Sequence, residues 1–297
     1  MRGQNTIERF SPDAKSLLHR LGTRAKKGLG QHFLIDRGVV EKIVSAAELV
    51  PSDTVIEVGP GLGILTGELV KRAGNVTAIE VDPKLASALQ KRLFKSAGLT
   101  VINADVLQVD PLELIDRKRR YKVVANLPYY IAAPILRHFL EVSLKPSLMV
   151  FMVQKEVGQS IAAAPGDMSI LSISVQLYGK PTIVDYVPAQ SFYPQPKVDS
   201  AIVRIDVYSK TAVDVKDTAD FFEIVKAGFS APRKQIRNSL ALGLRLTSAE
   251  TGELLQKASI KSQRRPETLS LEEWANLHRA FSSRATKLGR SKMQGNS

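Results

Sequence analysis

The sequence predicts a doubly wound α/β domain with a mostly parallel sheet, followed by a small all-helical domain. From residue 53 to residue 164, apolar runs of strand length alternate with segments of helical periodicity, which is typical of a parallel sheet covered by helices. A late pair of strand candidates predicts an antiparallel edge. After about residue 207 the strand patterns stop and only helical patterns follow.

The first half of the chain is predicted to alternate strands and helices. The predicted strands are 53–59, 75–82, 99–105, 121–130 and 147–154. The last of these is wholly apolar, as in a strand covered on both faces. The predicted helices are 64–74, 83–98, 131–142 and 155–164. Asp82 and Pro83 suit the N-cap and the first position of the second helix.

The second half is predicted to hold two more strands and then four helices. The strands are 172–179 and 200–208, and the helices are 217–230, 234–244, 248–259 and 270–284. The chain is therefore predicted to divide into four parts. These are a basic N-terminal extension (1–27), an α/β domain (28–208), a helical domain (209–287) and a disordered tail (288–297).

Composition and charge exclude some classes of site and favour a polyanionic partner. The 297 residues include no cysteine, which excludes disulfides and cysteine nucleophiles, and the four histidines lack ligand-like spacing, so no metal site is expected. Of the net charge of +13, residues 1–27 carry seven basic against two acidic residues, and residues 206–297 carry sixteen against ten. Basic flanks favour nucleic acid as a partner, and a solvated basic surface is the simpler alternative.

No apolar run in the sequence approaches the length that spans a membrane, and the N-terminus has no apolar stretch typical of a signal peptide. We therefore expect a cytoplasmic protein without a membrane partner.

A glycine-rich loop follows the first predicted strand. Gly59, Gly61 and Gly63 alternate in the stretch EVGPGLG, where a Cβ would keep a ligand away from the backbone. The dinucleotide fingerprint of nicotinamide oxidoreductases does not fit, because its third glycine position falls on Ile64 or Thr66. The spacing E-x-G-x-G-x-G instead resembles the first motif of class I S-adenosylmethionine-dependent methyltransferases.

Acidic residues end the next two predicted strands. In a methyltransferase of this class, Glu80 would accept hydrogen bonds from both ribose hydroxyls of the cofactor, and Asp105 would contact the adenine amino group. Ligands of open α/β sheets bind at the carboxyl ends of the strands. Three sites at three successive strand ends therefore predict S-adenosylmethionine as the cofactor.

The fourth predicted strand ends in Asn126-Leu127-Pro128-Tyr129, an unusual strand end that suits methylation of an exocyclic amine. The lone pair of an aromatic amine is delocalised, so two acceptors that bind both N–H groups would turn it toward the methyl donor. The Asn126 side-chain oxygen and the Leu127 carbonyl can be these acceptors, and Pro128 restricts Leu127 to an extended conformation. Tyr129 offers a face on which the target base can stack.

These residues carry a resemblance to a known family. The N-L-P-Y stretch is similar to the signature of amino-methylating nucleic-acid methyltransferases, in the form found in ribosomal RNA adenine dimethyltransferases. Residues 29–34 (LGQHFL) resemble that family's N-terminal segment, and residues 191–200 (SFYPQPKVDS) resemble its F-x-P-x-P-K-V-x-S loop. The chain is thereby identified as a member of the ribosomal RNA adenine dimethyltransferase family.

The resemblance implies a role for individual residues. The implied cofactor site consists of His32, Leu34, Gly59, Gly61, Gly63, Glu80, Asp105 and Asn126. The family often has asparagine at the position of His32, which favours a backbone contact there over acid–base chemistry. Phe192 is expected to face Tyr129 across a flipped adenine as an aromatic clamp. Lys197 could meet phosphate.

The start of the helical domain carries the candidate RNA contacts. Residues 228–238 are similar to the family's F-x-x-x-R-K-x-x-x-N element. Arg233 and Arg237 are four residues apart, so we expect one helical face to present both to phosphates, beside Lys234. Residues 28–208 would then be the methyltransferase domain and 209–287 the RNA-binding domain, which would recognise structured RNA by backbone and shape.

The family's small-subunit members imply dimethylation of N6 of two adjacent adenines in the 3′-terminal hairpin of 16S ribosomal RNA, by a monomer acting on an immature 30S-type subunit. Two alternatives remain open. One is the sister class that methylates 23S RNA and confers antibiotic resistance, and the other is a non-catalytic RNA- or DNA-binding factor on the same scaffold. Three stretches favour the small-subunit enzyme over the 23S enzyme: the sequence N-L-P-Y-Y, residues 153–157 and the R-K element. The intact cofactor motifs argue against a non-catalytic factor.

Overall fold

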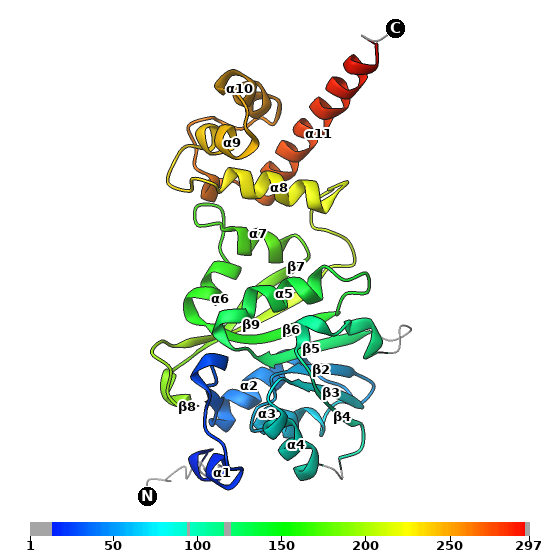
Figure 1. Cartoon of the computed structure of the whole chain (residues 1–297), viewed down its shortest axis with the longest axis vertical. Helices are drawn as coiled ribbons and strands as arrows, with labels where there is room; N and C mark the ends of the chain where they lie inside the picture. The colour runs from blue at the N-terminus through cyan, green and yellow to red at the C-terminus, as the bar shows by residue number, and fades with distance from the viewer. Residues whose placement is uncertain (1–13, 94–95, 116–119, 295–297) are drawn as a thin grey trace, which may run out of the picture. The chain divides into compact units, whose positions relative to one another are not determined.

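The computed structural model describes residues 14–93, 96–115 and 120–294 (Figure 1). It divides into two compact units. The first consists of Met1–Gln159 with Lys180–Val207, and the second of Ser160–Gly179 with Tyr208–Ser297. Residues 160–179, which the sequence places in the α/β domain, thus group with the C-terminal helices. Residues 1–13 of the basic extension lie outside the described residues.

The first unit is built on a seven-stranded sheet with the strand order β4-β3-β2-β5-β6-β9-β7. The strands are β2 (Thr54–Val58), β3 (Asn75–Glu80), β4 (Leu99–Asn103), β5 (Tyr121–Asn126), β6 (Leu148–Gln154), β7 (Gly179–Val187) and β9 (Ser200–Val207). The strands β4, β3, β2, β5 and β6 run parallel, and β9 pairs with β6 antiparallel. This arrangement confirms the predicted α/β sheet with an antiparallel edge.

Helices cover the sheet on both faces. The α-helices of this part are α1 (Ala14–Arg20), α2 (Arg37–Ala47), α3 (Ile64–Leu69), α4 (Pro83–Arg92), α5 (Ala132–Leu140) and α6 (Lys155–Ile161). Val124 of β5 lies in one hydrophobic cluster with Val40 and Ile43 of α2. Its neighbours Val123 and Ala125 point to the opposite face and are equally buried. Burial on both faces is why the central strands β5 and β6 are largely apolar.

Short elements complete the first unit and connect its strands. A two-stranded sheet pairs β1 (Phe33–Leu34) with β8 (Phe192–Tyr193), which brings the N-terminal segment beside the loop that precedes β9. Among the described residues of both units, the 3₁₀ turns are Lys27–Leu29, Val106–Gln108, Pro111–Glu113, Tyr129–Ile131, Ala189–Ser191 and Pro266–Thr268.

The strand predicted at 172–179 is wrong, because most of this segment is the helix α7 (Ile170–Gln176). Ser169 caps the helix: its side chain accepts from the Ser172 N–H, and the Ser172 hydroxyl binds the Ser169 backbone in return. The strand of this region is β7, one edge of the sheet, where exposed and half-buried residues alternate. Pro181 lies within it, which an edge strand tolerates.

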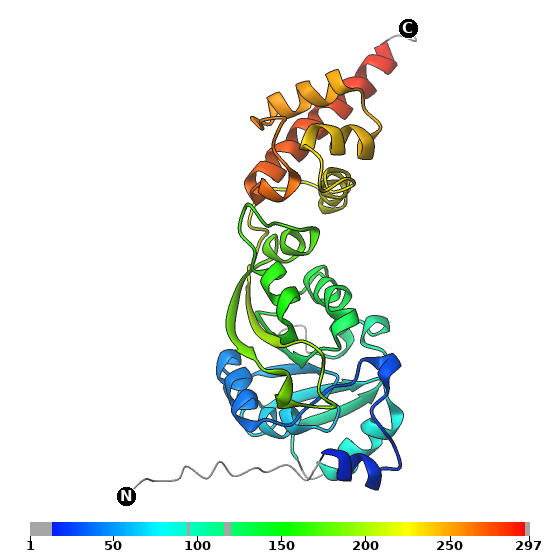
Figure 2. The same ribbon diagram turned by 90° about the vertical axis from the view of Figure 1, so that its left-hand side faces the viewer.

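The second unit is helical. Its further helices are α8 (Thr218–Gly228), α9 (Ile236–Leu244), α10 (Ser248–Lys257) and α11 (Leu271–Gln294), drawn in yellow to red in Figures 1 and 2. The helix α11 includes residues 288–294 of the tail for which disorder is predicted, and it ends at Gln294. Residues 284–294 contain no proline and mostly good helix formers, which lets the helix continue. Residues 295–297 lie outside the described residues.

Among the described residues, no helix combines the length and the apolar character needed to cross a membrane.

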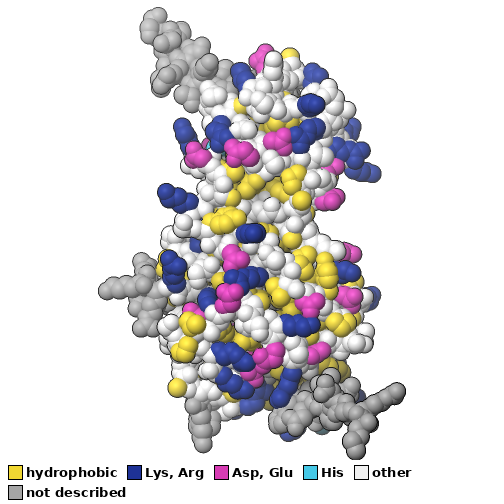
Figure 3. Space-filling model, turned by 180° about the vertical axis from the view of Figure 1, so that it is seen from behind, with side chains coloured by type: hydrophobic (Ala, Val, Ile, Leu, Met, Phe, Trp, Pro, Cys, Tyr) yellow, Lys and Arg dark blue, Asp and Glu magenta, His cyan; other side chains and the backbone are white. Residues whose placement is uncertain are grey.

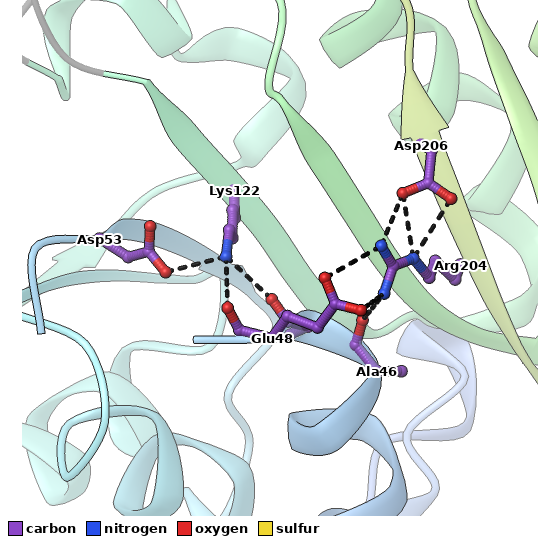
Figure 4. A network of polar contacts seen from close by, with 7 residues as sticks. Ala46, Glu48, Asp53, Lys122, Arg204 and Asp206 are labelled. Carbon is purple, nitrogen blue, oxygen red and sulfur yellow. Dashed lines mark hydrogen bonds and ion pairs between the residues drawn. The ribbon is translucent and has the colours of Figure 1, made fainter. Parts of the chain in front are cut away.

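A polar network fixes the amino end of β5 to the end of α2 (Figure 4). The Lys122 ammonium donates to the carbonyls of Ala47 and Glu48, at 3.0 and 2.7 Å, and to the Asp53 carboxylate at 2.9 Å. Beside it, the Arg204 guanidinium binds the carboxylates of Glu48 and Asp206. The two carbonyls stand at the C-terminus of α2, where the backbone has no helical partners of its own. The network therefore sets the position of β5, whose opposite end carries Asn126.

Replacing Lys122 should destabilise the fold. Lys122→Ala removes the ammonium donor that two carbonyls and the half-buried Asp53 carboxylate share, so we expect the free energy of unfolding to fall by about 1–3 kcal/mol. The control is Lys71→Ala, since Lys71 pairs with Glu68 on the surface and its side chain is 65% exposed. This variant should change the free energy by less than about 0.5 kcal/mol. Urea unfolding measures both, and equal losses would contradict the structural role of Lys122.

Candidate active site

A cavity of about 350 Å³ lies at the carboxyl ends of the parallel strands. Ten of the residues that the sequence singled out line it: His32, Leu34, Gly59, Gly61, Glu80, Asp105, Asn126, Leu127, Pro128 and Tyr129. They come from β1 and the residue before it, from the last residues of β3 and β5, and from the loops after β2, β4 and β5. The register of the parallel strands brings these loops to one edge of the sheet, which is why sites far apart in the sequence share one cavity.

The glycine loop wraps the end of β2. Gly59, Gly61 and Gly63 all have positive φ, between 54° and 71°, so other residues would be strained there. A Cβ on Gly61 would come within 3.0 Å of the Phe33 ring. Gly63 is expected to line the cavity but does not. A Cβ on Gly63 would clash with Leu89 and Arg92. The third glycine therefore serves close packing of α3 against α4.

Glu80 holds the loop in place from the end of β3. One carboxylate oxygen accepts from the Gly61 N–H at 3.0 Å and the other from the Asp82 N–H at 2.9 Å. Burial raises the pKa of Glu80, and these two N–H donors oppose that rise. Each carboxylate oxygen has further acceptor capacity, so the side chain can also bind hydroxyls in the cavity.

Asp105 stands in a similar place after β4. Its Oδ1 accepts from the Leu107 N–H at 3.0 Å, which caps the turn Val106–Gln108. Asp105 is half-buried and lines the cavity. The cap fixes the orientation of the carboxylate.

Glu57 is a site residue that the sequence reasoning did not select, although it opens the E-x-G-x-G-x-G pattern. It lines the cavity, and its buried Oε2 has no hydrogen-bond partner among the described residues. Burial raises the pKa of this carboxyl to about 8; the neighbouring Thr66 opposes the rise, and the nearby Glu80 charge adds to it. A buried acceptor without a partner is costly. Its presence at the cavity wall fits a cofactor that carries N–H donors and positive charge, as S-adenosylmethionine does.

The Asn-Leu-Pro-Tyr stretch is held on both sides. The Asn126 amide nitrogen donates to the His32 carbonyl at 3.2 Å, so the side-chain oxygen stays available as an acceptor. The Leu127 N–H donates to Met152 of β6 at 3.0 Å. Pro128 follows with φ −58° and ψ 130°, after which Tyr129 begins a short 3₁₀ turn. The backbone at Leu127 is thus fixed by the neighbouring strand and by the proline.

Tyr129 is anchored through a residue that the sequence reasoning quoted but did not select. Its hydroxyl lies 2.8 Å from the Ser200 hydroxyl, and Ser200 is fully buried at the start of β9. Burial raises the pKa of Tyr129. Ser200 is the last residue of the stretch SFYPQPKVDS, so its fixed place at the end of that motif was a usable signal.

The ring that stacks with Tyr129 belongs to His32. The two ring centroids lie 5.8 Å apart with an angle of 22° between the planes. The His32 Nδ1–H donates to the Pro194 carbonyl at 2.6 Å, which holds the imidazole in this position. His32 therefore contributes its ring to the site as well as its backbone carbonyl.

The expected place of Phe192 opposite Tyr129 is not what the structure shows. Phe192 is 3% exposed, pairs with Leu34 between β8 and β1, and packs in the core cluster of α2. As a strand residue it points to the core, while its neighbour Tyr193 points the other way toward Phe33. Lys197 is exposed and does not line the cavity.

The prediction that one helical face carries both Arg233 and Arg237 is also wrong. The helix α9 begins only at Ile236, with Gln235 as its N-cap in an extended conformation. Arg233 and Lys234 lie in the preceding turn, which is closed by a hydrogen bond from the Lys234 N–H to the Ala231 carbonyl. Arg237 is helical, and its guanidinium donates to the Ser248 carbonyl at 3.2 Å.

Comparison with known proteins decides the family. Residues 22–278 match the family model described as ribosomal RNA adenine dimethylase. The chain belongs to this family. It is an S-adenosylmethionine-dependent enzyme that dimethylates adenine in ribosomal RNA, and its first unit has the class I methyltransferase fold.

Individual relatives cover nearly the whole chain. Ribosomal RNA small subunit methyltransferase A of Dehalococcoides mccartyi is 49% identical over 264 residues, which cover 89% of this chain and 91% of the relative. The protein of the same name from Moorella thermoacetica is 42% identical over 276 residues, covering 90% and 96%.

Two solved structures are also similar. The 23S rRNA methyltransferase ErmE is 29% identical, with a TM-score of 0.67 over 84% of this chain and 98% of that one. A dimethyladenosine transferase from Plasmodium falciparum is 25% identical, with a TM-score of 0.73 over 86% and 98%.

The raised pKa of Glu57 predicts a pH-dependent stability. Between its ordinary value of 4.5 and the folded value of about 8, the folded protein keeps a proton that the unfolded chain has lost. The contribution of Glu57 to the free energy of unfolding is therefore fully present below pH 4.5 and is lost as the pH rises through 8. Relative to Glu57→Gln, the cofactor-free wild type should lose about 2 kcal/mol between about pH 6 and pH 8. The exposed Glu156→Gln serves as control in the same thermal unfolding series; a wild type and Glu57→Gln with parallel pH curves would contradict the assignment.

Proposed function

We propose that this enzyme dimethylates N6 of two adjacent adenines in the 3′-terminal hairpin of small-subunit ribosomal RNA, within an immature 30S-type subunit. The similar proteins support the small-subunit RNA as substrate over the large-subunit RNA. Relatives that are 42–49% identical over about nine tenths of the chain are named small-subunit methyltransferases, whereas the 23S enzyme ErmE is 29% identical. We further propose that the enzyme acts as a monomer in the cytoplasm.

S-adenosylmethionine supplies an electrophilic methyl group on a positively charged sulfur. The residues of this chain would bind and align the amine that receives it. In the first transfer the Asn126 side-chain oxygen and the Leu127 carbonyl accept the two N–H groups of the adenine, so that the nitrogen lone pair faces the cavity. The nitrogen gains the methyl group as the carbon–sulfur bond breaks and then loses one proton to solvent, which leaves one N–H to be held in the second transfer. Because the hydrogen bonds of Asn126 to His32 and of Leu127 to Met152 fix both acceptors in advance, the alignment costs little on binding.

The cofactor would lie in the cavity along the strand ends. Glu80 would bind the ribose hydroxyls, Asp105 the adenine amino group, and Glu57 the cationic methionine end. The remaining contacts would come from the backbone of the loop at Gly59 and Gly61 and from the segment His32–Leu34. The orphaned oxygen of Glu57 and the glycine loop with positive φ support this placement.

The target base would stack on Tyr129, which the hydrogen bond to Ser200 holds in place. Stacking on an aromatic ring offsets part of the cost of extruding a base from RNA. The His32 ring covers one face of Tyr129, so the base would stack on the other face.

The RNA would be held mainly through phosphates. We propose Arg233, Lys234 and Arg237 in the second unit and Lys197 in the first as contacts. On the face drawn in Figure 3, Lys and Arg side chains are interspersed with Asp and Glu, so the charge on that face forms no single basic patch. The proposed phosphate contacts therefore rest on the short segment around Gln235, at the start of α9. Arg233, Lys234 and Arg237 lie close together in the sequence there.

Methylation of defined substrates tests the function. The enzyme is incubated with labelled cofactor and small subunits from a strain that lacks the modification, and the modified bases are mapped. Large subunits and protein-free small-subunit RNA are the parallel substrates. We expect label in two adjacent adenines near the 3′ end of the small-subunit RNA. Label in the large-subunit RNA alone would refute the proposal, and labelling of free RNA equal to that of subunits would refute the requirement for a partly assembled particle.

Asn126→Ala should lower the rate of methylation at least about 100-fold, because one of the two acceptors for the amine is lost. Cofactor affinity, measured calorimetrically with S-adenosylhomocysteine, should stay within about threefold, because Asn126 is one of several residues implied at the cofactor site and its main role is toward the base. Activity within tenfold of wild type would overturn the proposed role of this amide.

The double variant Arg233→Ala, Arg237→Ala should flatten the salt dependence of RNA binding. Each lost phosphate contact reduces the slope of log K against log salt by roughly 0.7–0.9, so the change should be about 1.5. The control pair is Lys42→Ala with Lys71→Ala, two exposed lysines of the first unit. A slope that stays the same in the arginine variant would exclude this turn as an RNA contact.

A further inference from the structure

The helix α1 (Ala14–Arg20) precedes the part of the chain that matches the family model, which begins at residue 22. It nevertheless packs on the catalytic unit. Leu18 is 3% exposed and lies in a cluster with Phe33 and Leu85, while Leu62 packs against the edge of this cluster. The helix therefore contacts residues on the outer side of the glycine loop.

The same cluster forms part of the wall of the cofactor cavity. Phe33 and Leu62 line that cavity, and the Phe33 ring touches Gly61 closely enough that a Cβ there would lie 3.0 Å from it. Gly61 and Leu62 also line a second cavity of about 300 Å³, together with Leu17 and Leu21. The glycine loop thus has the cofactor cavity on one side and the side chains of α1 and the residue after it on the other.

Polar contacts hold the segment that follows α1. The Lys84 ammonium donates to the Gly22 carbonyl at 2.8 Å. The Lys26 ammonium forms an ion pair with Asp82 at 2.8 Å. The Asp82 N–H in turn donates to Glu80, the residue that holds the Gly61 N–H. One continuous set of contacts therefore runs from residues 22–26 to the glycine loop.

We propose that residues 14–26, which we name the N-terminal strap, position the glycine loop and Phe33 for the cofactor, with Leu18 as the main positioning residue. The inference rests on the cofactor site proposed above. With the strap in place, the loop is ordered before the cofactor arrives. Without it, binding has to order the loop and the Phe33 ring, and this cost appears as weaker cofactor affinity.

Leu18→Ala tests the strap. We expect the Kd of S-adenosylhomocysteine, measured by calorimetry, to rise about 5- to 30-fold. In methylation assays KM for the cofactor should rise by a similar factor while kcat stays within about twofold, because Leu18 touches neither the base nor the amine acceptors. His19→Ala, on the exposed side of the same helix, should leave Kd unchanged.

A second control separates positioning from general loss of stability. Leu254 in α10 of the second unit is 2% exposed, so Leu254→Ala also empties a buried leucine site but far along the chain from the loop. It should lower the melting temperature without changing the Kd of the cofactor product. If both leucine variants weaken binding equally, Leu18 acts only through stability and the inference is wrong.

Two further variants test the role of the strap without changing Leu18 alone. Lys84→Met removes the hydrogen bond to Gly22 without altering the strap, and deletion of residues 1–21 removes α1. Both should raise Kd, the deletion at least as much as Leu18→Ala. Wild-type affinity in the deletion variant would overturn the inference, whereas a wild-type chain that binds no S-adenosylhomocysteine would overturn the cofactor site itself.

Discussion

The buried carboxylate of Glu80 is the contact on which the site depends. Its two oxygens bind the N–H groups of Gly61 and Asp82, which belong to two different loops at the carboxyl edge of the sheet. A buried charge is tolerated only with such donors. The same residue therefore shapes the glycine loop, supports the start of α4 and still offers acceptors to the cavity.

The second part of the site is assembled from segments far apart in the sequence. Asn126 at the end of β5 binds the carbonyl of His32, and Tyr129 is held by Ser200 at the start of β9. His32 in turn binds Pro194 in the loop before β9. The three motifs quoted from the sequence are thus connected by direct hydrogen bonds around one tyrosine ring.

The errors of prediction have a common physical origin. Phe192 belongs to a two-residue strand whose pairing with β1 turns its ring into the core. Arg233 precedes a helix that begins only after an extended Gln235. The segment 172–179 is as apolar as a strand, but the reciprocal cap of Ser169 and Ser172 starts a helix there. In each case a local pairing or cap, at the scale of two or three residues, decided the orientation of the side chains.

The sequence by itself determined the alternating α/β order, the strand ends that carry the glycine loop, Glu80, Asp105 and Asn126, and the family. These features follow from hydrophobic periodicity and from the spacing of residues within short motifs, so they can be predicted without knowing which distant segments come into contact. Only the tertiary structure decided that His32 stacks on Tyr129, that Glu57 has an unpaired oxygen, and that Leu18 packs behind the glycine loop. Such contacts join residues distant in sequence, and burial and pairing exist only once the sheet has brought them together.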